Sequence, residues 1–334
     1  MRQRDSTLDE LMREADVAMY AAKGKGKNRV ERYDSAQDDM TVARHQLRVD
    51  LAAAADLGEL VLDYQPVVTL ETGMIVGVEA LVRWQHPTRG VLPPSEFIAL
   101  AEGTGAINGI GAWVLETAVR QVQHWQSRYA LPELWMSVNV SMRQVEAAGF
   151  ADCVTSILDT TGVATRCLVL EVTESILAES GGCASEVLAS LRLLGVRVAL
   201  DDFGTGFSSF SALCRLPVDI LKIDRSFVSG PDAGPGEALL ATVVAMARRL
   251  GLVVIPEGIE EPDQLARLRE MGCRFGQGFL LARPVSGGAI ETVLAARLPL
   301  PDVGLWAAIS RPSPAPVATD PSTPAPVIPR IPRP

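Results

Sequence analysis

The sequence predicts an α/β fold, a modified TIM (β/α)8 barrel in which one strand runs antiparallel to the others. Between Val76 and Gly258, short apolar runs repeatedly end in a polar residue, and amphipathic stretches of helix length separate them. Such runs are typical of parallel strands with both faces covered. The segment 58–298 is also close to the roughly 250 residues usual for this barrel. Because the C-terminal ends of barrel strands converge on one mouth, we expect the polar residues to meet there.

Two helical segments are expected before the barrel. Apolar residues recur at helical spacing from residue 6 onward, and Gly24 and Gly26 end that pattern, so residues 6–34 are predicted to form a small helical unit. A basic stretch follows its helix and is interpreted as a solvated helix end. The segment 38–57 carries further apolar residues at helical spacing and is predicted to be a linker helix that leads into the barrel.

The barrel is expected to open with a hairpin. Val61–Leu70 and Ile75–Leu81 both have strand-like patterns, and only four residues separate them. A parallel crossover needs about a dozen residues or more, so these two strands must be antiparallel. This is the source of the single antiparallel strand in the predicted fold.

The chain changes character after the barrel. Nine prolines fall between Pro312 and Pro334, among serine, threonine and alanine. A segment of this composition cannot bury a core, so residues 299–334 are predicted to be a disordered tail. A Pro-rich ligand for a partner protein is the functional alternative.

Composition restricts the function and the compartment. The net charge of −9 argues against binding to DNA or RNA polymers or to anionic lipid, which requires basic surfaces. The five cysteines show no CxxC pairing, and the three histidines show no paired spacing, so neither disulfides nor a histidine-based metal site is expected. No signal peptide or membrane-spanning apolar segment is recognised, and a cytoplasmic location is predicted.

The polar residues at the predicted strand ends share one chemistry. Gathered carboxylates raise each other's pKa unless cations are present, and carboxylate and amide oxygens are ligands that magnesium and manganese prefer. The sequence therefore predicts a divalent-metal site, and so an enzyme. The residues that end the apolar runs are Glu79, Asn139, Glu171, Asp201 with Asp202, Lys222 with Asp224, and Glu257.

Taken singly, these residues also have structural interpretations. Glu79 could form an ion pair with Arg83, and Asn139 could cap a helix. Asp201 and Asp202 could belong to a tight polar turn, while their adjacent carboxylates, pointing in different directions, would suit one residue per metal or a shared bridge. Lys222 could pair with Asp224.

Taken together in strand order, the motifs resemble those of the EAL domain family of cyclic di-GMP phosphodiesterases. The resemblance covers about residues 58–298 and nearly every predicted strand end. The motifs that carry it are Tyr64-Gln65-Pro66, Glu79-Ala80-Leu81 with Arg83, Asn139-Val140-Ser141, Glu171 to Glu174, Asp201 to Gly206, Leu221 to Asp224, Glu257 to Glu260, Gln277-Gly278 and Arg283-Pro284.

The resemblance implies hydrolysis of one phosphodiester bond of cyclic di-GMP to give linear 5′-pGpG, with two Mg²⁺ or Mn²⁺ ions. It also implies a homodimer formed through the barrel. The implied metal ligands are Glu79, Asn139, Glu171, Asp201, Asp202 and Glu257. The implied catalytic residues are Lys222, which positions or deprotonates the attacking water, with Asp202 and Glu257. The implied substrate contacts are Gln65, Arg83, Glu260, Gln277 and Pro284. Glu174 is implied to hold the loop from Asp202 to Ser209 in position.

Some positions depart from the family pattern. Pro256 stands where a small residue usually precedes Glu257, and it removes a backbone donor and fixes φ. Phe207 replaces a common tyrosine, and Arg274 a common aspartate. No implied ligand is missing, so the alternative of a receptor that binds cyclic di-GMP without hydrolysis rests on Pro256 alone.

The N-terminal residues have a second resemblance. Residues 1–37 are similar to the last helix and strand of a GGDEF domain, whose signature motif this chain lacks. We therefore expect these residues to be a C-terminal remnant of that domain, and the chain to be the rear part of a longer GGDEF–EAL protein or a gene product truncated at its start.

Overall fold

The computed structural model describes residues 46–173, 183–204, 213, 216–229, 235–297 and 299–300, with isolated positions 12 and 19. The expected remnant over residues 1–37 and the expected tail therefore lie almost entirely outside the described residues. Glu174 and the greater part of the loop that follows Asp202 also lie outside them.

The barrel opens with the expected antiparallel hairpin. Strand β1 (Leu60–Thr69) pairs with strand β2 (Ile75–His86), and Gln65 lies opposite Glu79. The link between them is a tight turn in which the amide of Gly73 donates to Thr69 O at 2.8 Å. Gly73 has a φ of 69°, a left-handed conformation that glycine adopts without steric strain.

The remaining strands follow in parallel order around the barrel. They are β4 (Trp135–Asn139), β5 (Leu168–Thr173), β6 (Arg197–Phe203), β7 (Ile220–Ile223) and β8 (Val253–Pro256). Each pairs with the next, so their C-terminal ends point the same way.

A short strand closes the ring. Strand β9 (Phe275–Gly276) pairs antiparallel with β1. Backbone hydrogen bonds from Gln277 N to Pro256 O (3.0 Å) and from Ile259 N to Gln277 O (3.2 Å) join the end of β8 to the end of β9. The predicted barrel with one antiparallel strand is thus confirmed. Two further strands that the sequence did not reveal, β3 (Gly90–Leu92) and β10 (Val285–Ser286), pair antiparallel with β2 and β1.

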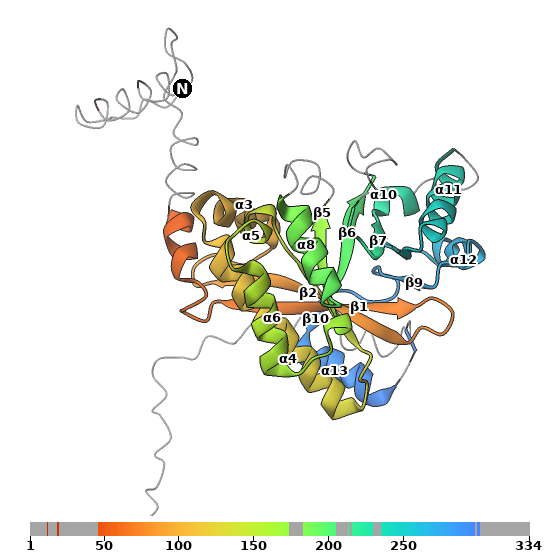
Figure 1. Cartoon of the computed structure of the whole chain (residues 1–334), viewed down its shortest axis with the longest axis horizontal. Coiled ribbons are helices and arrows are strands. Elements are labelled where there is room, and N and C mark those ends of the chain that lie inside the picture. The colour runs from red at the N-terminus through yellow and green to blue at the C-terminus, as the bar shows by residue number, and fades with distance from the viewer. Residues whose placement is uncertain are drawn as a thin grey trace, which may run out of the picture.

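Helices cover the outside of the barrel (Figure 1). The longest, α4 (Ile107–Tyr129), buries Val114, Ala118, Val122 and Trp125, a spacing of three and four residues that places them on one face. The others are α3 (Pro94–Thr104), α5 (Met142–Val145), α6 (Phe150–Thr161), the 3₁₀ helix η1 (Thr165–Cys167), α8 (Cys183–Leu193), α10 (Arg225–Val228), α11 (Pro235–Arg249), α12 (Pro262–Glu270) and α13 (Gly287–Ala296).

The helical segment before the barrel packs against it. Residues 46–53 are helical, and Leu47 and Leu51 on this segment are buried. Asp50 lies 3.3 Å from Nε2 of the buried His86 at the end of β2. In the described part of the chain, no helix is both long and apolar enough to cross a membrane.

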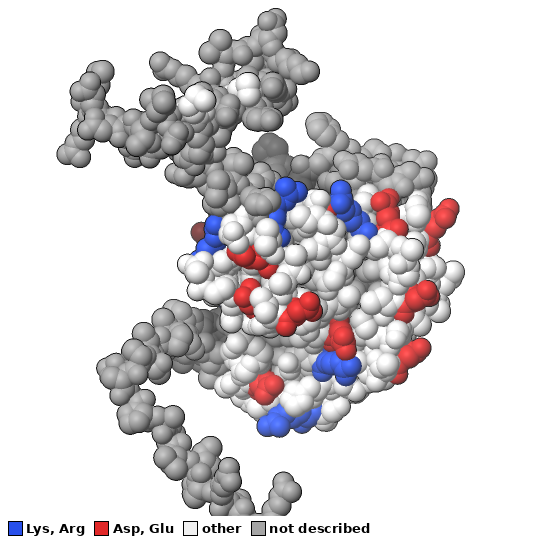
Figure 2. Space-filling view, turned by 90° about the vertical axis from the view of Figure 1, so that its left-hand side faces the viewer, with Lys and Arg blue, Asp and Glu red and all other residues white. Residues whose placement is uncertain are grey.

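Charges of both signs are interspersed on the face shown in Figure 2. Acidic side chains are spread over this face, and Arg side chains lie among them and the uncharged residues. Within its described residues, this face presents no continuous basic surface of the kind that a nucleic acid polymer requires.

Trp84 anchors the core between β2 and α3. The side chain is fully buried, and its ring meets Phe97 edge-on with the centroids 5.8 Å apart. Its indole Nε1 donates to Glu59 Oε2 at 2.9 Å, so the one polar atom of the ring is satisfied. This packing fixes β2, the strand that carries Glu79.

We therefore expect Trp84→Ala to lower the free energy of unfolding by about 3–5 kcal/mol, because it leaves a large cavity and an unpaired Glu59. Leu193→Ala is the matched control, since Leu193 is 91% exposed and its truncation should change stability by less than about 0.5 kcal/mol. Urea denaturation of both variants measures the difference. Equal stabilities would contradict the role given to Trp84.

Candidate active site

The functional side chains gather at the mouth because the strands are aligned there. Asn139 at the end of β4 lies opposite Glu171 in β5, and Thr173 lies opposite Asp201 in β6. Glu79 enters from β2, which is parallel to β4. The polar residues that ended the predicted strands therefore meet in space.

Lys222 is the centre of this group. Its ammonium Nζ lies 2.7 Å from Glu171 Oε2 and 2.7 Å from Glu257 Oε1. It also lies 3.2 Å from Asp201 Oδ1 and 3.3 Å from Glu79 Oε2. The lysine side chain is only 2% exposed. One buried cation thus contacts four carboxylates that come from four different strands or strand ends.

Glu79 is held by amides as well as by the lysine. Asn139 Nδ2 donates to Glu79 Oε1 at 2.8 Å, and Gln277 Nε2 donates to Glu79 Oε2 at 2.8 Å. Because both oxygens accept hydrogen bonds, the carboxylate is oriented before any ligand arrives. Gln277, from the end of β9, thereby joins the group next to the metal-ligand candidates.

The structural interpretations of Glu79, Asn139 and Lys222 fail. Arg83 pairs with Asp63 rather than with Glu79. The cap of α5 is Ser141, whose side chain accepts from the amide of Gln144. Asp224 accepts from the amide of Ser226 at 2.9 Å and caps α10 instead of pairing with Lys222.

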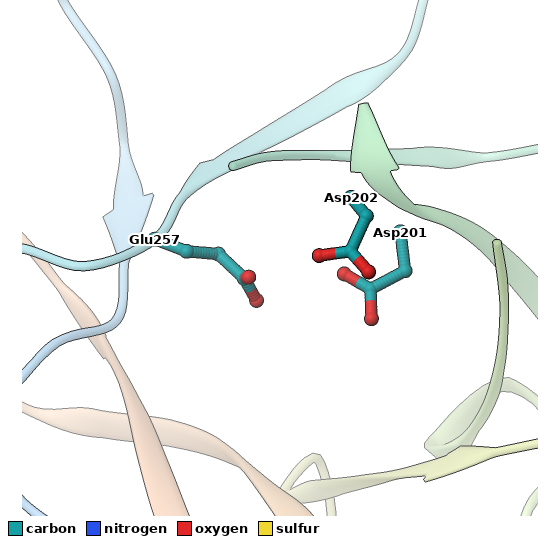
Figure 3. A group of neighbouring side chains, drawn as sticks. All are labelled: Asp201, Asp202 and Glu257. Atoms are coloured by element: carbon teal, nitrogen blue, oxygen red, sulfur yellow. The ribbon is translucent and has the colours of Figure 1, made fainter. Parts of the chain in front are cut away.

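Three carboxylates form a compact acidic cluster beside the lysine. One oxygen from each of Asp201, Asp202 and Glu257 lies within 4.8 Å of the others. Figure 3 shows Glu257 pointing across the mouth toward the two adjacent aspartates. Neighbouring residues of a regular strand point to opposite faces, but here a register shift after Leu200 and a φ of 55° at Asp202 bring both aspartates to the same place.

This donor set fits divalent ions. Asp201 Oδ1 is buried and accepts no hydrogen bond from the described residues, although Lys222 Nζ is close. If all five acids of the group were ionised, one ammonium would leave a large excess of negative charge in a buried site. Asp201, Asp202 and Glu257 are placed to hold a divalent cation, and Glu79, Asn139 and Glu171 offer further oxygen donors beside it.

Burial and mutual repulsion shift the pKa values of the acids upward. Burial, followed by the charge of Glu79, raises the pKa of Glu171 well above its ordinary value. Burial raises the pKa of Glu257 to about 8, despite the nearby ammonium. Burial and then neighbouring carboxylates also raise the pKa of Asp202. These acids tend to hold protons until further positive charge is supplied.

Lys222 and Glu79 are shifted toward their charged forms. Burial alone would lower the pKa of Lys222, but Asp201 and the other carboxylates raise it well above its ordinary value. Burial would likewise raise the pKa of Glu79, yet Lys222 and the hydrogen bonds from Gln277 and Asn139 lower it. The centre of the site is therefore a charged lysine paired with an ionised Glu79.

A cavity of about 250 Å³ opens above these residues. Gln65, Glu260 and Gln277 line it, as expected of substrate contacts. The other described residues of its lining are Glu79, Leu81, Asp201, Lys222, Asp224, Arg225, Glu257, Gly258, Gly278 and Phe279.

Two expected substrate contacts do not line this cavity. Arg83 lies further along β2 and contacts Asp63, and Pro284 precedes β10. Conversely, sequence reasoning missed Arg225 and Phe279, which do line it. Only their positions, one residue after Asp224 and one after Gly278, could have suggested them. Glu174 lies outside the described residues.

Comparison with known proteins identifies the family. A family model described as "EAL domain" matches residues 48–284, which is more than half of the chain. The chain belongs to the EAL domain family. The motifs of the barrel mouth thus belong to a recognised domain.

The chain is similar to curated proteins and to solved structures. It is 40% identical over 280 residues to MucR of Pseudomonas aeruginosa, named a bifunctional diguanylate cyclase/cyclic di-GMP phosphodiesterase, covering 84% of this chain and 41% of that protein. It is 38% identical over 289 residues to the cyclic di-GMP phosphodiesterase NbdA of the same organism, covering 86% and 37%. A solved structure of the PaMucR phosphodiesterase in complex with cyclic di-GMP matches at a TM-score of 0.69 and 40% identity, covering 73% of this chain and 99% of that one.

The chain therefore spans well under half the length of these two curated relatives. The likeness covers this chain and leaves more than half of each of those proteins unmatched.

The raised pKa of Glu257 gives a pH dependence for the metal-free protein. On folding, this pKa rises from 4.5 to about 8, so the protonated acid is the form that the fold favours. The associated stability is present at acidic pH and is lost as the pH rises through about 8. We expect Glu257→Gln, which cannot ionise, to be more stable than the wild type at about pH 9 by on the order of a few kcal/mol, with a smaller difference at about pH 5.

Chemical denaturation with a chelator at both pH values measures this effect. Glu270→Gln, a change at an exposed glutamate of α12, is the matched control and should follow the wild type. If Glu257→Gln differs from the wild type by the same free energy of unfolding at both pH values, the pKa of Glu257 is not raised by folding.

Proposed function

We propose that this EAL domain hydrolyses cyclic di-GMP to linear 5′-pGpG. The observation that carries the proposal is the buried ammonium of Lys222 among four carboxylates, beside the compact cluster of Asp201, Asp202 and Glu257. An ion pair that served stability alone would not require so many acids around one cation. The phosphodiesterase names of MucR and NbdA support the choice of reaction.

In the proposed reaction, water attacks phosphorus and the bond from phosphorus to one sugar O3′ breaks. The water oxygen becomes part of the new 5′-phosphate, one proton goes to the leaving O3′, and a linear dinucleotide results. Two bound Mg²⁺ or Mn²⁺ ions would neutralise the phosphate oxygens and acidify the attacking water.

Lys222 is assigned to orienting the water rather than to removing its proton. In the metal-free protein the surrounding carboxylates raise the pKa of Lys222 well above its ordinary value, so Nζ is a hydrogen-bond donor there, which favours the orienting role. Glu79 remains ionised and is fixed by Asn139 and Gln277, which suits a ligand whose oxygens must already be in place.

The substrate is proposed to lie over the cavity at the barrel mouth. Gln65 donates to Ala282 O at 3.1 Å, and this bond to the segment before β10 orients its amide. Gln65, Gln277 and Glu260 line the cavity and offer polar groups for a nucleotide. Arg83 and Pro284 are proposed to contact the substrate further along the mouth. The reported cyclic di-GMP complex of PaMucR supports this choice of ligand.

Pro256 gives no support to a receptor without hydrolysis. Pro256 O accepts from the amide of Gln277, and Glu257 N donates to Ile223 O at 2.9 Å, so the end of β8 stays paired. Glu257 also reaches Lys222 at 2.7 Å. Although proline lacks a backbone N–H, the Glu257 carboxylate keeps its contact with Lys222.

The proposal extends to location and assembly. Cys153, Cys167, Cys183 and Cys273 are free thiols, which is consistent with a reducing, cytoplasmic compartment. A homodimer is proposed on the family resemblance alone.

Chromatographic assay of cyclic di-GMP turnover by the full chain tests the function. We expect 5′-pGpG in the presence of Mg²⁺ or Mn²⁺ and none with EDTA. Glu79→Gln and Asp201→Asn should each reduce turnover on the order of a thousandfold, because each removes a charged oxygen donor. Glu270→Gln, on the outside of α12, should keep wild-type turnover.

Other outcomes point to other functions. If the protein binds cyclic di-GMP but forms no product with either Mg²⁺ or Mn²⁺, its function would be that of a cyclic di-GMP receptor and not of an enzyme. Neither binding nor turnover would direct the search to other phosphodiesters, tested by the same assay.

A further inference from the structure

On strands β1 and β2, side chains on one face form a row that begins at Glu79 and extends toward the outer edge of the barrel mouth. In β2, Glu79, Leu81 and Arg83 lie on one face because side chains alternate along a strand. Opposite them in β1, Gln65 faces Glu79 and Asp63 faces Leu81. Gln65, Glu79 and Leu81 line the cavity, so Asp63 and Arg83 belong to the same face one step further out.

Asp63 and Arg83 form a diagonal cross-strand ion pair. Arg83 Nε lies 3.0 Å from Asp63 Oδ2, and the two side chains are 17% and 31% exposed. Diagonal neighbours on an antiparallel pair lie within reach of a long side chain. The pair is thus partly shielded from water and sits where the mouth of the barrel begins.

The contacts fix the guanidinium in two directions. Nε points to Asp63, and Nη1 donates to Val82 O at 3.0 Å. An arginine side chain has five N–H donors in one plane. In the described part of the chain, these contacts leave donors on Nη1 and Nη2, the edge that suits a bidentate contact with a phosphate.

The carboxylate of Asp63 lies near the mouth, where it affects the charge that a substrate meets. If the substrate is an anionic dinucleotide, the charge of Asp63 near the mouth repels it. The guanidinium of Arg83 neutralises this charge, and it is also the group through which Asp63 can act on substrate binding.

We propose that Asp63 is a positioning residue that holds Arg83 in the orientation in which its free edge receives a substrate phosphate. The inference rests on the proposed function, since it takes cyclic di-GMP as the ligand. Asp63 does not itself touch the substrate. It acts by removing the conformational freedom that Arg83 would otherwise lose on binding.

Kinetics of four variants test this role: Asp63→Ala, Asp63→Asn, Arg83→Ala and the double variant with both alanines. We expect Asp63→Ala to raise KM about fivefold while kcat stays within about twofold. Asp63→Asn, which still accepts from Nε, should recover part of the loss. Calorimetric binding of cyclic di-GMP with EDTA present should weaken by a similar factor, which makes the test independent of turnover.

The double variant decides whether Asp63 acts through Arg83. In the Arg83→Ala background, Asp63→Ala should cause no further weakening. Glu133→Gln is the control, because it breaks an exposed Arg–Glu pair with Arg166 away from the cavity and should leave KM unchanged.

Two results would overturn the inference while the proposed function stands. The first is an unchanged or lower KM in both Asp63 variants of an active enzyme. The second is that Asp63→Ala weakens binding by the same factor in the Arg83→Ala background as in the wild type. A wild-type protein that neither binds nor hydrolyses cyclic di-GMP contradicts the proposed function first, and this inference with it.

Discussion

The structure of the site depends on the charge balance around Lys222. Its buried ammonium contacts carboxylates from β2, β5, β6 and the end of β8, so one side chain connects most of the mouth. A buried lysine without partners would lose its proton, and buried acids without a cation would keep theirs. Together the lysine and part of the carboxylates remain charged, and the excess negative charge favours the binding of a divalent cation.

The barrel makes this balance possible because parallel strands end at the same level. Each parallel strand brings at least one functional residue at or just after its end, and helices on the outside let the strand interiors be almost wholly apolar. The antiparallel β1 adds a different element. It runs from the rim into the barrel, so Asp63 lies opposite Leu81 near the rim and Gln65 lies opposite Glu79 deeper in the mouth. Side chains of β1 can therefore contact the substrate at successive distances from the metal-ligand candidates.

Much of this could be predicted from the sequence. The short link at Gly73 required a hairpin, and each apolar run showed where a strand ended. The individual contacts between residues distant in the sequence could not be predicted, because the apolar pattern of a strand does not show which side chain of another strand it will contact. Glu79 with Arg83 and Lys222 with Asp224 were plausible neighbours in sequence, yet the partners come from other strands. The left-handed Asp202, the short strands β3 and β10, and the cavity position of Phe279 depend on tertiary packing and leave no periodic signal.

The most direct measurement is the stability of Lys222→Met at about pH 8, with EDTA and with excess Mg²⁺, compared with the wild type. The account predicts a loss of about 3–5 kcal/mol with EDTA, because four carboxylates lose their cation, and a larger recovery by Mg²⁺ than the wild type shows. Arg120→Met, which breaks an exposed pair on α4, should change little. A metal-free Lys222→Met as stable as the wild type, with no added response to Mg²⁺, would contradict the central role of this lysine.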